Sequence, residues 1–113
     1  MSNFNFDAAS FDEQYVYGAQ RPGYHSSRPI PDAEVELWVE FMQQQGIERV
    51  CCLLEEQLSY YESDLLAAYK RFFGGEAVCS APIKDFTLAD EHLLTETILP
   101  FLADSVQKNE PVI

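Results

Sequence analysis

The chain has 113 residues, of which 47% are hydrophobic and 13% aromatic, enough apolar material for one packed domain. Nineteen acidic residues against seven basic ones give a formal charge of -12, so a phosphate-rich polymer is repelled and nucleic acid is not an expected partner. No segment reaches the roughly 18 consecutive apolar residues of a membrane span, and the N-terminus lacks the pattern of a secretory signal. We therefore expect no membrane partner and a cytoplasmic location.

The sequence contains three cysteines, Cys51, Cys52 and Cys79, which is an odd number with no CxxC spacing. All three lie inside apolar segments, a setting typical of buried and unreactive thiols that behave as small hydrophobic residues. A disulfide framework or a zinc site would need a different number or spacing. We therefore expect no metal site and no cofactor.

Residues 1–14 carry aromatic side chains among Asn, Ser and Asp, without a sustained period, and we expect them to form an N-terminal arm packed by those aromatics. An aromatic and β-branched run follows at residues 15–19 and ends in a Pro-Gly turn, which predicts a short strand that enters a turn. Arg21 lies in that turn and is our candidate substrate-binding residue. The alternative for Arg21 is a solvated turn residue.

The next segment predicts a helix and a buried strand. Apolar residues have helical spacing from Val35 to Met42. Asp32 is placed to cap the first turn, and Gly46 is placed to end the helix in a left-handed conformation. Residues 50–54 form a continuous apolar run, which is typical of a parallel strand buried on both faces.

A second helix is predicted over residues 61–72. Ser59 and Glu62 match a capping box at its start, and Gly74 follows its last turn. Residues 77–83 then form a third short apolar stretch with the length of a strand.

A third helix is predicted over residues 90–108, with Thr87 and Asp90 at its start and a kink at Pro100. Residues 111–113 follow a helix end and a turn, and they have the character of a fourth strand that is just beginning.

Strands that alternate with helices indicate an α/β fold, with a mostly parallel sheet that is flanked by helices. We place the domain at residues 15–113 and expect it to be incomplete, because the strand at 111–113 only begins. Ligands of open parallel sheets bind beyond the carboxyl ends of the strands, so chemistry is expected at the end of that strand.

Residues 78–87 read VCSAPIKDFT and resemble the general-acid loop of small dual-specificity phosphatases, in which Pro-Ile-x-Asp follows an apolar strand. Residues 90–108 resemble the next helix of that family, and residues 109–113 resemble the strand that leads into its His-Cys-x5-Arg loop. Upstream, residues 15–23 and 38–54 are similar to earlier strand and helix segments. From residue 15 onward, the chain resembles the N-terminal part of a cysteine-dependent protein phosphatase of the dual-specificity and protein-tyrosine phosphatase family.

The resemblance implies a protein-tyrosine-phosphatase-like fold, truncated before the phosphate-loop strand. It also implies hydrolysis of phosphotyrosine, phosphoserine or phosphothreonine through a cysteinyl-phosphate intermediate, on a phosphorylated protein or a small phosphoester. A thiolate attacks phosphorus in such enzymes, and an Asp protonates the leaving oxygen. The matching Asp is Asp85. No His-Cys pair with a downstream Arg occurs in the 113 residues, so we expect them to supply the general-acid loop without the nucleophile and to be inactive alone.

Other interpretations stay open. Asp85 could be an ordinary surface carboxylate, and Lys84 departs from the Pro or small residue that is common beside it in the family. Asp90 is a competing acid, although its position suits a helix cap better. Glu55 and Glu56 follow the second predicted strand, but two carboxylates there would repel phosphate. In place of an enzyme, the chain could be a catalytically inactive phosphatase-like interaction module, or an unrelated acidic α/β interaction domain.

Overall fold

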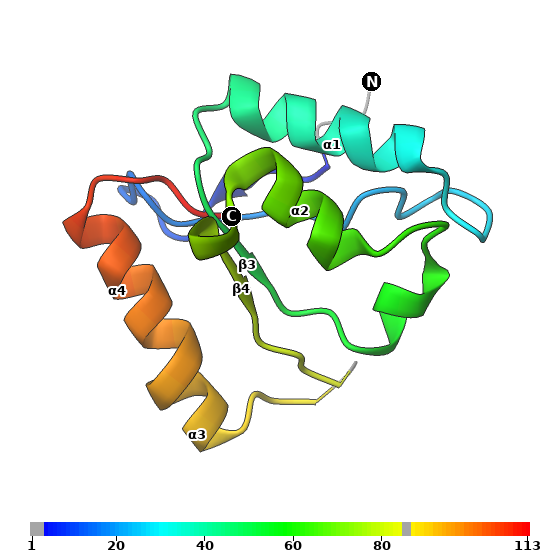
Figure 1. Cartoon of the computed structure of the whole chain (residues 1–113). Coiled ribbons are helices and arrows are strands. Elements are labelled where there is room, and N and C mark those ends of the chain that lie inside the picture. The colour runs from blue at the N-terminus through cyan, green and yellow to red at the C-terminus, as the bar shows by residue number, and fades with distance from the viewer. Residues whose placement is uncertain (1–3, 85–86) are drawn as a thin grey trace.

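The computed structural model describes residues 4–84 and 87–113, and it has a mixed α/β architecture built on a small parallel sheet (Figure 1). Strand β3 (Val50–Cys52) pairs in parallel with β4 (Val78–Ser80), so that Cys51 lies opposite Cys79. The pairing continues past both strands, because the Ile83 N–H donates to the Leu53 carbonyl at 2.9 Å. The expected parallel sheet is therefore present.

The segment at 111–113 joins this sheet between two other strands. Val112 forms parallel bridges with Val16 on one side and with Arg49 on the other, and its side chain is fully buried. The Tyr17 N–H donates to the Val112 carbonyl at 2.9 Å, and the Cys51 N–H donates to the Ile113 carbonyl at 2.8 Å. The order across the sheet is thus residues 15–17, residues 111–113, β3 and β4, all parallel.

The N-terminal arm is tied to the first strand. Strand β1 (Asp7–Ala8) pairs antiparallel with β2 (Tyr17–Gly18). Phe6 stacks on Tyr17 with ring centroids 5.0 Å apart, and it meets Phe41 edge-on at 5.7 Å. The aromatic side chains of the arm therefore pack onto the domain, with the exception of the fully exposed Phe11.

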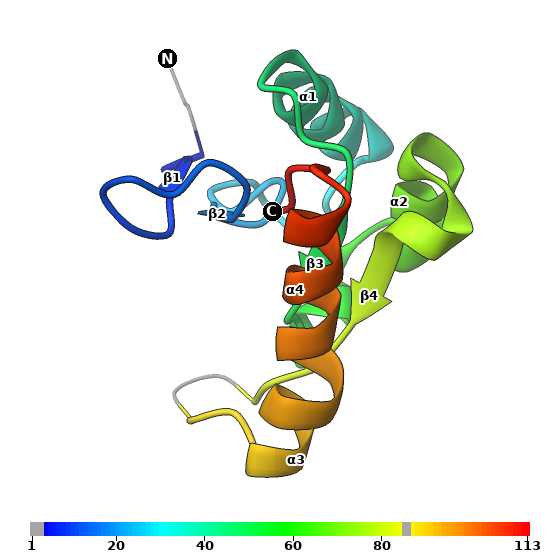
Figure 2. The same cartoon turned by 90° about the vertical axis from the view of Figure 1, so that its left-hand side faces the viewer.

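Helices α1 (Asp32–Gln44) and α2 (Leu65–Phe73) lie together over one face of the sheet (Figures 1 and 2). Helix α1 buries the predicted apolar stripe, and Trp38 packs on Tyr69 with ring centroids 5.3 Å apart. The Trp38 indole N–H donates to the Gln20 carbonyl at 2.8 Å. Gly46 follows the helix with φ 85°, so the predicted left-handed end is confirmed.

Two predicted helix caps are wrong. Asp32 is the first residue of α1 rather than its cap, and its carboxylate accepts from the Ser63 hydroxyl at 3.1 Å. Ser59 lies in the 3₁₀ helix η1 (Glu56–Tyr60), and Asp64 caps α2 by accepting from the Ala67 N–H at 3.1 Å.

A long-range contact explains the later start of α2. Tyr61 forms a parallel bridge with Ile30, and the Glu62 N–H donates to the Ile30 carbonyl at 2.9 Å. This pairing keeps Tyr61 extended, so the helix cannot begin at Tyr61 as its apolar spacing predicts. The tight connection η2 (Gly75–Ala77) then leads from α2 into β4.

A single long helix covers the opposite face of the sheet (Figure 2). It consists of α3 (Glu91–Leu93), the π-helical turn η3 (Leu94–Ile98) and α4 (Leu99–Gln107). Pro100 has no N–H to donate and would clash with the carbonyl of Glu96 in a regular α-helix. The π-helical turn before Pro100 accommodates the proline, because its backbone hydrogen bonds span five residues instead of four. The kink stays a prediction.

Arg49 attaches this helix to the sheet. Its side chain is 6% exposed and donates to Asp104 on α4 at 2.9 Å, and its guanidinium lies 4.1 Å from the centre of the Phe101 ring. Lys108 also contacts Asp104, at 3.1 Å. Hydrogen bonds from Arg49 and then Lys108 hold the pKa of the Asp104 carboxyl below its usual value.

Gly23 provides a sharp test of the loop that follows the first strand. It has φ 64°, and a Cβ built on it would lie 2.5 Å from Cγ2 of the fully buried Ile30. We expect Gly23→Ala to lower the free energy of unfolding by roughly 2–4 kcal/mol, from left-handed strain and overpacking together. Urea denaturation measures this change.

Gly18→Ala is the matched control, because a methyl group on Gly18 would meet no heavy atom of the described residues within 4 Å and its φ is not positive. We expect its effect to stay within about 0.5 kcal/mol. Equal losses in the two variants would show that the contact between Gly23 and Ile30 does not constrain this loop.

Candidate functional site

The carboxyl ends of three neighbouring strands border one cavity of about 190 Å³. Such an edge is where open parallel sheets bind ligands. The first strand contributes its end and the following turn, β3 contributes its whole length and the two residues after it, and the strand at 111–113 contributes its last residue. Its lining residues are Tyr17, Gly18, Ala19, Gln20, Arg21, Trp38, Val50, Cys51, Cys52, Leu53, Leu54, Tyr69 and Ile113.

Arg21, the candidate substrate-binding residue, lies at this edge. Its guanidinium donates to the Tyr61 hydroxyl at 3.4 Å, and that hydroxyl donates to the Pro22 carbonyl at 2.6 Å. The guanidinium carbon also lies 5.2 Å from the centre of the Tyr24 ring and 5.3 Å from that of Tyr60. Burial raises the pKa of Tyr61 although Arg21 opposes the shift, so Tyr61 is a neutral donor at physiological pH.

A second cavity, of about 530 Å³, adjoins the first and shares Gln20, Arg21 and Leu54 with it. Its other lining residues are Tyr24, Arg28, Gln57 and Tyr60. The sequence pattern did not identify Arg28 or Tyr60, because neither lies in a recognisable motif and the two are far apart in the chain. The feature of the sequence that could have indicated this cavity is the presence of two arginines, Arg21 and Arg28, close together in an acidic chain.

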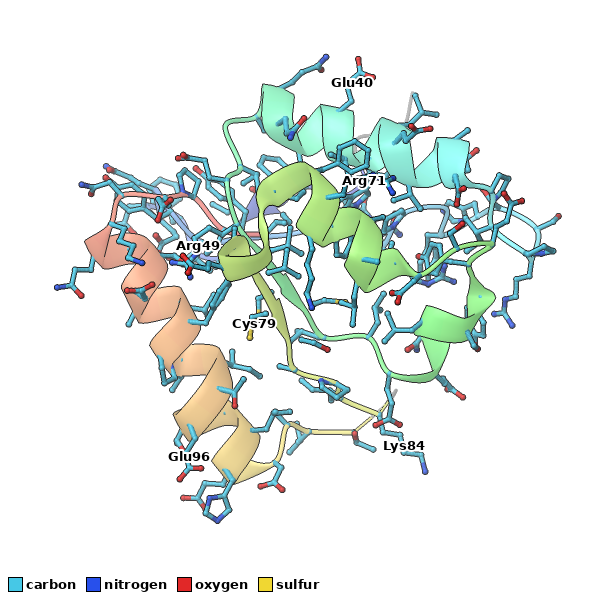
Figure 3. The ribbon with its side chains drawn as sticks, viewed as in Figure 1. Glu40, Arg49, Arg71, Cys79, Lys84 and Glu96 are labelled. Atoms are coloured by element: carbon cyan, nitrogen blue, oxygen red, sulfur yellow. The ribbon has the colours of Figure 1, made fainter. Side chains whose placement is uncertain are left out.

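Asp85, the candidate general acid, lies outside the described residues. The described chain on its N-terminal side extends from β4 along Leu53 to Ile83, at the same carboxyl edge of the sheet. Lys84 follows as an exposed residue at that edge (Figure 3). The Thr87 N–H donates to the Lys84 carbonyl at 3.2 Å.

Asp90, the competing acid, has a structural role. It is the N-cap of the long helix, and its carboxylate accepts from the His92 N–H at 2.9 Å. A capping carboxylate of this kind is stabilised by the free N–H groups of the first turn. The prediction that Asp90 suits a helix cap is confirmed.

The three cysteines lie within or beside the sheet core, and all are free thiols. Cys52 is buried, whereas Cys51 and Cys79 are half-buried neighbours on β3 and β4. Burial, followed by the proximity of Cys79, raises the pKa of the Cys51 thiol to about 12. Burial also raises the pKa of Cys52. A protonated thiol is a poor nucleophile, so these two cysteines have structural roles at neutral pH.

Several other polar residues do not line the two cavities. Glu55 and Glu56 are exposed, and neither lines them. His92 is exposed and lies 3.5 Å from Glu96 on the same helix. Within residues 4–84 and 87–113, no three His, Cys, Asp or Glu side chains are grouped to hold a metal ion. No helix in the same part of the chain is long and apolar enough to cross a membrane.

Comparison of the chain with protein-family models, with curated proteins and with solved structures finds no match.

The raised pKa of Cys51 predicts slow alkylation of the folded protein. At pH 8 a thiol with a pKa of about 12 has about a thousandfold less thiolate than one with an ordinary pKa. We expect iodoacetamide to modify Cys51 about a thousandfold more slowly in the native chain than in urea, and the native rate to rise with pH up to about 12. Peptide mass mapping identifies the modified residue. Equal native and unfolded rates at pH 8 would contradict the structural role.

Proposed function

We propose that these 113 residues are the substrate-facing, general-acid part of a cysteine-dependent protein phosphatase, with the nucleophile supplied by residues beyond Ile113. The observation that carries the proposal is the position of residues 111–113. They form the inner parallel strand between residues 15–17 and β3, and their last residue borders the cavity at the carboxyl edge. A loop that continues from this strand would therefore enter the sheet's ligand-binding edge.

The direction of the chain crossovers supports this choice of edge. The first two crossovers, through α1 and α2, run outward over one face, whereas the long helix returns the chain across the other face to residues 111–113. Ligands of open α/β sheets bind at the point where crossovers leave to opposite faces. Here that point lies next to residues 111–113, beside Arg21.

The chemistry follows from the resemblance of residues 78–87. A thiolate of the complete protein attacks phosphorus and forms a cysteinyl phosphate, while the leaving oxygen takes a proton from Asp85. Water then attacks the cysteinyl phosphate and releases inorganic phosphate. Arg21 supplies positive charge beside the reacting group, which an acidic protein must concentrate locally.

The coding sequence after Ile113 tests the assignment first. A His-Cys-x5-Arg loop within about a dozen residues supports the enzyme. Its absence leaves the phosphatase-like interaction module as the function of the same surface.

Asp85→Asn in the complete protein tests the role of the acid. We expect hydrolysis of alkyl or tyrosyl phosphates to fall by roughly 10²–10⁴, because these leaving groups need a proton. With a phenol of low pKa as leaving group, the loss should be small, since departure needs little proton donation. Steady-state rates over a series of leaving groups measure the difference.

Asp90→Asn is the control, because Asp90 caps the long helix. We expect it to lower stability by at most about 1 kcal/mol and to leave the dependence on the leaving group unchanged. If Asp90→Asn shows the leaving-group dependence and Asp85→Asn does not, the assignment of the acid is wrong.

A further inference from the structure

The larger cavity, which we name the arginine cavity, is lined by Gln20, Arg21, Tyr24, Arg28, Leu54, Gln57 and Tyr60. Two of the seven basic residues of the chain meet here, although acidic residues number nineteen. Among the described residues, no Asp or Glu lines the cavity. A site with two guanidinium groups and no lining carboxylate favours an anionic ligand.

Stacking on Tyr60 holds the Arg28 side chain in place. The guanidinium carbon of Arg28 lies 3.4 Å from the centre of the Tyr60 ring, which is the contact of a stacked pair. A guanidinium that stacks through its face keeps its N–H groups at the edge, where they can donate to two oxygens of one phosphoryl group. The Tyr60 backbone is itself fixed, because its carbonyl accepts from the Ile30 N–H at 2.8 Å.

The other arginines of the chain differ from this pair. Arg49 is buried and bonded to Asp104. Arg71 also lies over an aromatic ring, that of Phe72 at 4.9 Å, but its cavity is lined by carboxylates, those of Asp32, Glu36 and Asp64. In the part of the chain that the structure describes, no ion pair involves Arg21 or Arg28. Their positive charge is therefore available to a ligand.

We infer that the arginine cavity binds a second phosphoryl group, so that the preferred ligand carries two. The inference rests on the proposed function for the position of the first phosphoryl group, in the adjoining cavity at the strand ends. Arg21 lines both cavities and Arg28 lines only the arginine cavity. Arg28 is thus the residue that distinguishes a doubly from a singly phosphorylated ligand, with the amides of Gln20 and Gln57 as further polar groups at the cavity wall.

Binding of inorganic phosphate to the 113-residue chain tests the cavity without any hydrolysis. Backbone amide chemical shifts of residues 20–28 and 57–60 should respond to phosphate in the wild-type chain. We expect Arg28→Gln to raise the dissociation constant for phosphate about tenfold. Arg28→Lys, which keeps the charge but loses the planar stack on Tyr60, should raise it less.

Arg71→Gln is the matched control, because it removes the same charge from an arginine over an aromatic ring. It should leave phosphate binding unchanged. Equal weakening by Arg28→Gln and Arg71→Gln would show a general effect of net charge and overturn the inference, as would the absence of a response at residues 20–28 and 57–60. Thermal unfolding checks that each variant is folded. If Arg28→Gln does not fold, the phosphate affinity of Arg28→Lys is the test of the inference.

Turnover by the complete protein separates the two hypotheses and the two sources of a second phosphoryl group. We expect Arg28→Gln to reduce kcat/KM by about tenfold for fructose 1,6-bisphosphate or for a doubly phosphorylated peptide, and to leave singly phosphorylated counterparts unaffected. The substrate whose kcat/KM falls more in Arg28→Gln, the sugar bisphosphate or the peptide, represents the preferred source of the second phosphoryl group. If Arg28→Gln lowers kcat/KM equally for singly and doubly phosphorylated substrates, the second phosphoryl site is ruled out and the phosphatase proposal stands. If phosphate binding depends on Arg28 but the complete protein hydrolyses no phosphoester, the phosphatase proposal is ruled out and the anion site stands.

Discussion

The parallel pairing of residues 111–113 between two strands is the constraint on which the other parts of the fold depend. The backbone of Arg49 forms two hydrogen bonds of this pairing. Its N–H donates to the Pro111 carbonyl at 3.1 Å, and its carbonyl accepts from the Ile113 N–H at 3.0 Å. Its side chain reaches Asp104 on α4 at the same time. One residue therefore joins the inner strand, β3 and the long helix. Because a buried guanidinium left without its carboxylate is costly, the helix and the inner strand are held in one arrangement.

Two arginines lie close together near the carboxyl edge of the sheet in an otherwise acidic molecule. Of the basic residues, Arg49 and Lys108 are used by Asp104, far from the strand ends, whereas Arg21 and Arg28 share the loop after the first strand. Aromatic rings hold both of them without neutralising their charge. The field of the whole protein repels anions, so the arginine pair can attract an anion only at short range.

Local patterns predicted the helices and parallel strands well, because apolar spacing reports which faces are buried. They failed where distant residues decide the backbone: pairing of Tyr61 with Ile30 delays α2, and Asp64 rather than Ser59 caps it. The candidate site likewise combines a residue that local sequence indicates with a contact that only folding creates. Arg21 could be proposed from its turn, whereas the stack of Arg28 on Tyr60 exists only after the chain has folded. The role of Asp85 rests on resemblance, because a general acid is defined by its distance to a substrate and spacing in a sequence does not supply that distance.

The π-helical turn before Pro100 sets the rotational phase of the long helix. A turn of this kind holds one residue more than a regular helical turn, and one residue corresponds to a rotation of about 100° around the axis. The residues before the turn are therefore rotated about the axis, by roughly that angle, from the positions they would take in a uniform helix. Because Arg49 fixes α4 on the sheet, the rotation falls on the first turn of the helix and on the chain that enters it. The π-helical turn before Pro100 thus sets the angle about the helix axis between α4, which Arg49 contacts, and the chain that enters the helix at Asp90.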